Sequence, residues 1–114
     1  MRLVESTISL EELKQMSEKM AYNLVKAVVD IEKKIMMVDA DLHADEEVAL
    51  LDQDSDQKNL WGINIYPERV GNDNWIEFDS MINLRPSWGN KTRGVDDPKI
   101  REQILAIVKK LVTI

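Results

Sequence analysis

Two runs of alternating apolar and polar residues constrain the fold of this chain most strongly. The first spans residues 60–66, where the apolar positions are Trp61, Ile63 and Ile65. The second spans residues 76–83, where Ile76, Phe78 and Ile82 alternate with Glu77, Asp79 and Asn83. Successive side chains of a β-strand point to opposite faces of the sheet, so both runs predict strands with one apolar and one polar face.

Helix signals flank these strands. Ser9 and Glu12 have the spacing of a capping box, and leucine and methionine residues at helical spacing then predict a helix over residues 10–24. Near the other end of the chain, Asp96 is predicted to cap a helix over residues 97–112, with Pro98 in its first turn. Residues 2–8 predict a short edge strand.

The stretch 25–38 is compatible with two structures. Its β-branched residues are dense, and E-K-K divides two apolar runs as a hairpin turn does. We therefore favour a hairpin of two strands. The alternative is a continuation of the first helix to Val38, because apolar residues also recur here at helical spacing.

These elements predict an α+β fold in a single domain over residues 1–114. A chain of 114 residues is too short to divide into two units that each bury a core. The predicted architecture is a two-layer sandwich, in which two helices pack on one face of a mostly antiparallel sheet.

Composition excludes several classes of function. The chain has no cysteine, so disulfides and thiol catalysis are excluded. A net charge of −6 argues against nucleic-acid and anionic-membrane partners, since both require a basic surface. The chain also lacks a secretory leader and an apolar run of roughly 18 residues, so we expect a cytoplasmic, acidic protein.

A possible metal site lies around the only histidine. If residues 42–50 form a strand, the spacing of two puts His43, Asp45 and Glu47 on one face, and Glu77 on a neighbouring strand could join them. Imidazole and carboxylate groups suit a divalent metal ion. The alternative is a solvated strand face whose charges prevent edge-to-edge aggregation.

Other polar residues suggest catalysis or ligand binding. Asp79 and Arg85 are candidates for a catalytic base and an anion clamp, unless they only form ion pairs across strands. Asn64 and Asn83 share the polar parity and are candidate ligand-binding residues. Asn90 and Arg93 lie in a glycine-containing loop that could form an anion nest, or could be a connector with Trp88 packed on the core.

Four segments carry a resemblance to a known family: H-A-D-E-E, L-W-G-I-N-I-Y-P, I-E-F-D-S-M-I-N-L-R-P and G-N-K-T-R. With them, the chain resembles a family of short, uncharacterised prokaryotic proteins that is classified only as a domain of unknown function. The resemblance covers nearly the whole chain and implies a turn at Ala40-Asp41. It supports the predicted fold and implies no activity, cofactor or partner.

The function we favour from the sequence is a small cytoplasmic binding or interaction module that needs no cofactor. We expect a homodimer, because Tyr66 and Trp75 fall on the polar parity, where aromatic residues suit an interface. The alternative is a metal-dependent hydrolase in which His43, Asp45 and Glu77 hold a divalent metal. A third possibility, a toxin-like RNA-processing enzyme, is disfavoured by the negative charge.

Overall fold

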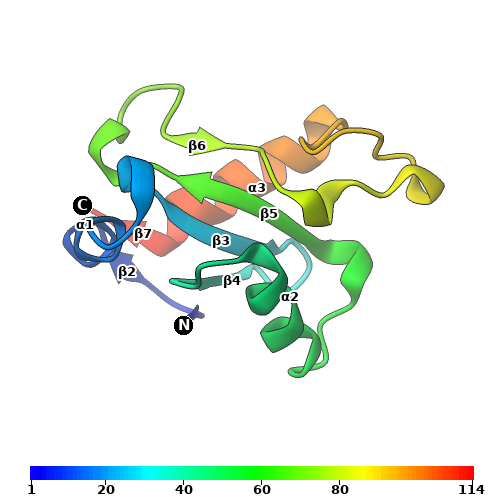
Figure 1. The fold of residues 1–114 in the computed structure, drawn as a ribbon, viewed down its shortest axis with the longest axis horizontal. Helices are drawn as coiled ribbons and strands as arrows, with labels where there is room; N and C mark the ends of the chain where they lie inside the picture. Colours follow the sequence, from blue (N-terminus) through cyan, green and yellow to red (C-terminus); the bar gives the residue numbers. More distant parts are fainter.

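A β-hairpin over residues 25–38 forms the centre of the sheet in the computed structural model, which describes residues 1–114. The sheet has five antiparallel strands in the order β1-β4-β3-β5-β6 (Figure 1). Their bounds are β1 Arg2–Val4, β4 Ile35–Val38, β3 Val25–Asp30, β5 Leu60–Ile65 and β6 Ile76–Glu77. A separate parallel pair consists of β2 Ile8–Ser9 and β7 Val112–Thr113.

Three helices accompany the sheet: α1 Leu10–Ser17, α2 His43–Leu51 and α3 Pro98–Leu111. Five single 3₁₀ turns lie in the connections: η1 Ala21–Asn23, η2 Gln57–Asn59, η3 Pro67–Arg69, η4 Met81–Asn83 and η5 Pro86–Trp88. The α+β class and the mostly antiparallel sheet are as predicted. None of the helices is long and apolar enough to cross a membrane.

Local side-chain chemistry explains the hairpin. The Asp30 carboxylate accepts hydrogen bonds from the backbone N–H groups of Glu32 and Lys33, both at 3.0 Å, which stabilises the turn between β3 and β4. Lys34 completes the turn in the left-handed region, with φ 58°. The alternative of one long helix to Val38 is therefore wrong.

The first helix is shorter than predicted. Its capping box is present, since the Ser9 hydroxyl accepts from Glu12 N–H and the Glu12 carboxylate accepts from Ser9 N–H. The helix ends at Ser17 rather than near residue 24, and Tyr22 and Asn23 take positive φ values of 66° and 53°. These left-handed residues turn the chain back into β3.

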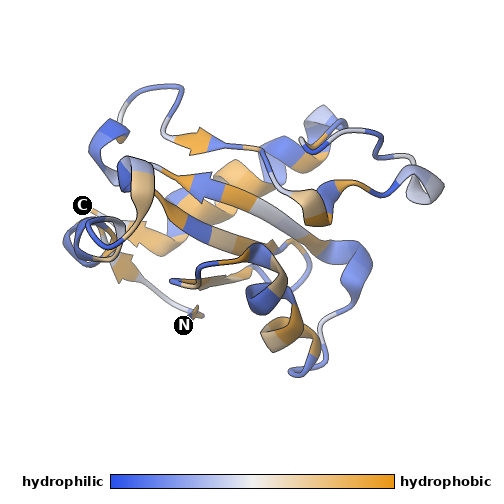
Figure 2. Cartoon of the chain, in the orientation of Figure 1, coloured by the Kyte–Doolittle hydropathy of each residue, from blue (hydrophilic) through white to orange (hydrophobic).

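Both faces of the sheet are covered, whereas the sequence predicted helices on one face only. The larger apolar core packs α1 and α3 against one face through residues that include Leu13, Ile104 and Val108. A smaller cluster of Val28, Met37, Leu50 and Leu60 packs α2 on the opposite face. In Figure 1, α3 lies behind the sheet and α2 in front of it, and Figure 2 shows apolar residues concentrated on the strands between them.

Helix α2 replaces the strand predicted around His43. Alanine, glutamate and leucine are good helix formers, and His43, Glu46 and Leu50 are buried together because they recur at helical spacing. The spacing of two between His43, Asp45 and Glu47 therefore does not place them on one face. The helical spacing of these buried residues is present in the sequence. The alternation of polar and apolar residues over the same segment favours a strand, and the prediction followed the alternation.

The strand predicted over residues 76–83 is also mostly wrong. Only Ile76–Glu77 pairs with β5, after which the chain leaves the ladder and turns at η4. The close approach of this turn to β5 requires Gly62, because a Cβ atom there would lie 2.6 Å from the Ser80 Cβ. In place of a strand, the amide side chain of Asn83 bonds to both backbone groups of Gly62.

Trp75 is not the surface aromatic that the sequence predicted. It is 8% exposed and belongs to the larger core. Tyr66 is half-buried and also has partners within the chain, since its hydroxyl lies 3.2 Å from a Glu77 carboxylate oxygen and Arg69 stacks on its ring at 4.0 Å. The homodimer therefore stays a prediction, and the surface aromatic residues that were its main argument have partners within the chain.

Candidate functional site

The proposed metal ligands do not form one site. His43, the first residue of α2, is buried, Asp45 is exposed, and Glu47 pairs with Arg85 at 3.3 Å. Glu77 accepts a hydrogen bond from the Asn64 amide at 2.8 Å. No three histidine, aspartate or glutamate side chains lie close enough together to hold a metal ion.

The geometry of His43 suits a structural role. Its Nε2 lies 2.7 Å from the carbonyl oxygen of Ile63, which can only accept, so Nε2 carries the proton. Burial is the main cause that lowers the pKa of His43 below its usual value, which keeps the ring neutral at pH 7. The imidazole therefore fastens α2 to β5.

Replacing His43 by alanine is expected to lower the free energy of unfolding by about 1–3 kcal/mol, because a buried hydrogen bond and its packing are lost. Thermal melts with and without divalent metal measure this, with Asp45→Ala as an exposed control on the same helix. A loss of stability that occurs only with metal present would contradict the structural role.

The candidate catalytic pair is not assembled either. Asp79 pairs with Arg93 at 2.8 Å on the surface, while Arg85 is buried and pairs with Glu47. Arg93 is thus an exposed partner of Asp79. Both residues form ion pairs, but neither pair joins two strands: Glu47 lies in α2, and Asp79, Arg85 and Arg93 lie outside the strands.

Two of the candidate asparagines hold the backbone in place. The Asn83 amide bonds to Gly62, and the Asn90 amide donates to the carbonyl oxygens of Asn83 at 2.7 Å and Gly94 at 2.8 Å. The Asn90 side-chain oxygen accepts from Asp96 N–H at 2.8 Å. Asn64 keeps a buried side-chain oxygen without a partner.

The predicted anion nest in the loop is already occupied by the protein. The Asp96 carboxylate accepts from Lys91 N–H at 2.6 Å, and the Thr92 hydroxyl accepts from Gly94 N–H at 3.1 Å.

Asp97, rather than the predicted Asp96, caps α3 by accepting from Lys99 N–H at 2.9 Å. Trp88 is 57% exposed, so its predicted packing on the core is wrong.

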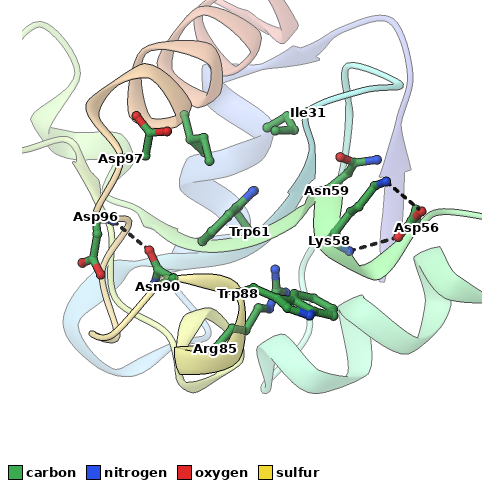
Figure 3. Close-up of a pocket in the computed structure, with 12 residues that line it drawn as sticks. Ile31, Asp56, Lys58, Asn59, Trp61, Arg85, Trp88, Asn90, Asp96 and Asp97 are labelled. Carbon is green, nitrogen blue, oxygen red and sulfur yellow. Dashed lines mark hydrogen bonds and ion pairs between the residues drawn. The ribbon is translucent and has the colours of Figure 1, made fainter.

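A cavity of about 650 Å³ lies between the end of β3, the start of β5, residues 85–90 and the start of α3. Figure 3 shows the side chains around it. This volume falls within the range of small-molecule sites. The cavity is lined by Ile31, Asp56, Lys58, Asn59, Trp61, Arg85, Trp88, Gly89, Asn90, Asp96, Asp97 and Ile100. We call it the Trp61–Arg85 pocket.

Two residues that line this pocket each have a buried hydrogen-bond donor without an acceptor. The donors are the indole Nε1 of Trp61 and the Nη1 of Arg85, and both atoms are buried. Trp61 as a residue is 6% exposed and Arg85 is 9% exposed. Native proteins pair nearly all buried donors, so two orphaned donors in residues around one cavity call for a ligand or ordered water as their acceptor.

The rest of the Arg85 guanidinium is fixed by the protein. Its Nη2 donates to the Leu60 carbonyl oxygen at 2.7 Å and to the Glu47 carboxylate at 3.3 Å. The guanidinium also lies between two indoles, 5.0 Å from the Trp61 ring centre and 5.5 Å from the Trp88 ring centre. Burial lowers the pKa of Arg85 and Glu47 opposes that shift, so the group stays charged.

The sequence identified part of this pocket. From the sequence, Arg85 and Asn90 are candidate site residues, Trp61 is predicted only to lie in the core, and no site role is predicted for Lys58, Asp56, Asp96 or Asp97. The parity of Trp61 correctly predicts its burial. That its N–H lacks an acceptor depends on which groups surround it, and no sequence pattern carries that information.

The fold and the pocket together define an α+β domain with a partly apolar cavity at one end of its sheet. The chain belongs to the family described as "Protein of unknown function (DUF5674)", whose model matches residues 2–111. The resemblance to an uncharacterised family is thereby confirmed. Comparisons with curated proteins and with solved structures give no match.

Proposed function

We propose that this protein is a small-molecule-binding domain whose binding site is the Trp61–Arg85 pocket. The observation that carries the proposal is that two residues lining one cavity, Trp61 and Arg85, each have a buried donor without an acceptor, Nε1 and Nη1. A ligand that supplies oxygen acceptors would remove the energetic cost of both, which is about 1–3 kcal/mol for each unpaired buried group.

The surroundings of the donors indicate the kind of ligand. Ile31, Ile100 and the ring of Trp61 form an apolar part of the wall, while the two donors fix where an acceptor can lie. A carboxylate accepts two N–H groups through its two oxygens and matches an arginine especially well. The ligand is therefore a small organic molecule with a carboxylate or a similar oxygen group.

Trp88 controls access to Arg85. It stacks on the guanidinium beside Trp61 (Figure 3) and more than half of its surface is exposed. Because Nη1 is almost inaccessible to solvent, ligand binding requires a side chain around Arg85 to shift, and the Trp88 ring is an exposed neighbour that can do so. Few packing contacts hold an exposed ring, so this shift costs little.

Replacing Trp61 by phenylalanine is expected to weaken ligand binding roughly 3- to 10-fold, the equivalent of one neutral hydrogen bond. Phenylalanine keeps an aromatic ring and removes only the Nε1 donor and part of the indole. A panel of small carboxylates, amides and phosphate esters is screened by thermal shift, and binders are measured by isothermal titration calorimetry.

The matched control is Trp75→Phe, which makes the same change in the core and away from the Trp61–Arg85 pocket. It is expected to leave affinity unchanged. The proposal is overturned if no panel member binds the wild-type protein, or if Trp75→Phe weakens binding as much as Trp61→Phe does.

A further inference from the structure

The positive charges of the Trp61–Arg85 pocket are already compensated by the protein. Arg85 pairs with Glu47 at 3.3 Å, and Lys58 pairs with Asp56 at 3.8 Å. A simple anion would therefore find two donors but little uncompensated positive charge. This disfavours a phosphate or another multiply charged anion as the whole ligand.

Two carboxylates in the same pocket have no ion-pair partner, although the positive charge of Arg101 acts on Asp96. Asp96 and Asp97 line the cavity, and neither forms a salt bridge. Their hydrogen bonds come from neutral groups: Asp96 accepts from Lys91 N–H and the Thr92 hydroxyl, and Asp97 accepts from Lys99 N–H. Both side chains therefore keep lone pairs for a cationic group.

The acidic side chains and the arginine lie on different sides of the pocket. In Figure 3, Asp96 and Asp97 lie on one side of Trp61, and Arg85 with Trp88 lies below it. Ile31, Ile100 and the Trp61 ring complete the wall. The residues around the pocket thus carry carboxylates, an apolar surface and two buried donors without acceptors.

We propose that the ligand of this pocket is an aliphatic amino carboxylate. Its carboxylate accepts from Trp61 Nε1 and Arg85 Nη1, its hydrocarbon part lies against the isoleucines, and its ammonium group lies against Asp97. This inference rests on the proposed function and adds the requirement for a positively charged group.

Three probes that differ by one charged group test the requirement: ε-aminocaproate has both groups, caproate has only the carboxylate, and hexylamine has only the ammonium. Isothermal titration calorimetry on the full chain at pH 7 compares them. We expect ε-aminocaproate to bind at least about five-fold more tightly than either other probe, which corresponds to about 1 kcal/mol.

A conservative variant then assigns the ammonium site. Asp97→Asn removes a charge, and asparagine caps helices as well as aspartate does, so the fold is expected to persist. It should weaken ε-aminocaproate about five-fold and leave caproate unchanged. Glu102→Gln removes one charge from the same helix outside the pocket and should change neither affinity.

The outcomes separate this inference from the proposed function. If caproate binds as tightly as ε-aminocaproate, or if Asp97→Asn leaves the ε-aminocaproate affinity unchanged, the amino carboxylate is overturned. Failure of ε-aminocaproate to bind at about 10 mM also overturns it. In each case, another ligand whose affinity depends on Trp61 would still uphold the proposed function.

Discussion

Replacing Asn83 by alanine is expected to lower the free energy of unfolding by about 3 kcal/mol or more. The Asn83 side chain accepts from Gly62 N–H at 2.8 Å and donates to the Gly62 carbonyl oxygen at 2.9 Å, so it pairs both groups as a neighbouring strand would. The same amide donates to the Arg93 carbonyl oxygen at 2.9 Å. Alanine leaves these buried backbone groups unpaired, at about 1–3 kcal/mol for each group.

Urea denaturation followed by circular dichroism measures the change. Asn74→Ala is a suitable control, because Asn74 is exposed and its side chain makes no hydrogen bond; its effect should stay within about 0.5 kcal/mol. If Asn83→Ala is equally mild, the amide does not replace a strand at the edge of β5.

Replacing Glu46 by glutamine is expected to make the protein more stable above pH 7 and to remove much of its pH dependence. Glu46 is fully buried, and only one of its carboxyl oxygens has a partner, the Ala40 N–H at 3.1 Å. Burial is the main cause that raises the pKa of Glu46 from 4.5 to about 9. The folded protein therefore keeps this carboxyl protonated at neutral pH.

The sign of the effect follows from proton linkage. The unfolded chain releases the Glu46 proton above pH 4.5, while the folded chain holds it to about pH 9, so folding stability falls as pH rises between these values. The slope is about 1.4 kcal/mol per pH unit, which gives a loss of about 3 kcal/mol by pH 7. Glutamine never ionises and can still accept from Ala40 N–H.

Denaturation of both proteins at several pH values between pH 5 and pH 9 measures the difference. His43 has a lowered pKa, so its contribution is lost as pH falls, in the opposite direction, and it is common to both proteins. Glu68→Gln removes an exposed carboxyl and serves as the control. Parallel curves for wild type and Glu46→Gln would mean that Glu46 is ionised inside the folded protein.

Features that depend on a few neighbouring residues could be predicted from the sequence. The Ser9–Glu12 capping box, the hairpin over residues 25–38 and the strand over residues 60–65 are all present. Each of them is decided by short-range hydrogen bonds or by alternation along one segment. The α+β class follows from these elements, since their apolar faces must be buried against one another.

Two of the predicted strands are wrong for a common reason. Residues 42–50 and 76–83 both alternate, yet most of the first segment lies in α2 and the second leaves the sheet after Glu77. In α2, burial of Leu50 against the sheet outweighs the alternation. In the second segment, the Asn83 amide takes the hydrogen bonds of the missing strand. Alternation describes side-chain polarity, whereas pairing is decided by which backbone groups find partners.

The sequence by itself determined the class of fold, the exclusion of thiol chemistry and the position of the central strands, because these depend on composition and local spacing. Only the tertiary structure decided that the candidate metal ligands are dispersed and that Trp61 and Arg85, which line one cavity, have orphaned donors. An unpaired donor is defined by groups that approach it from distant segments. Residues 31, 61, 85 and 100 meet only after β3, β5, the loop after η4 and α3 have packed.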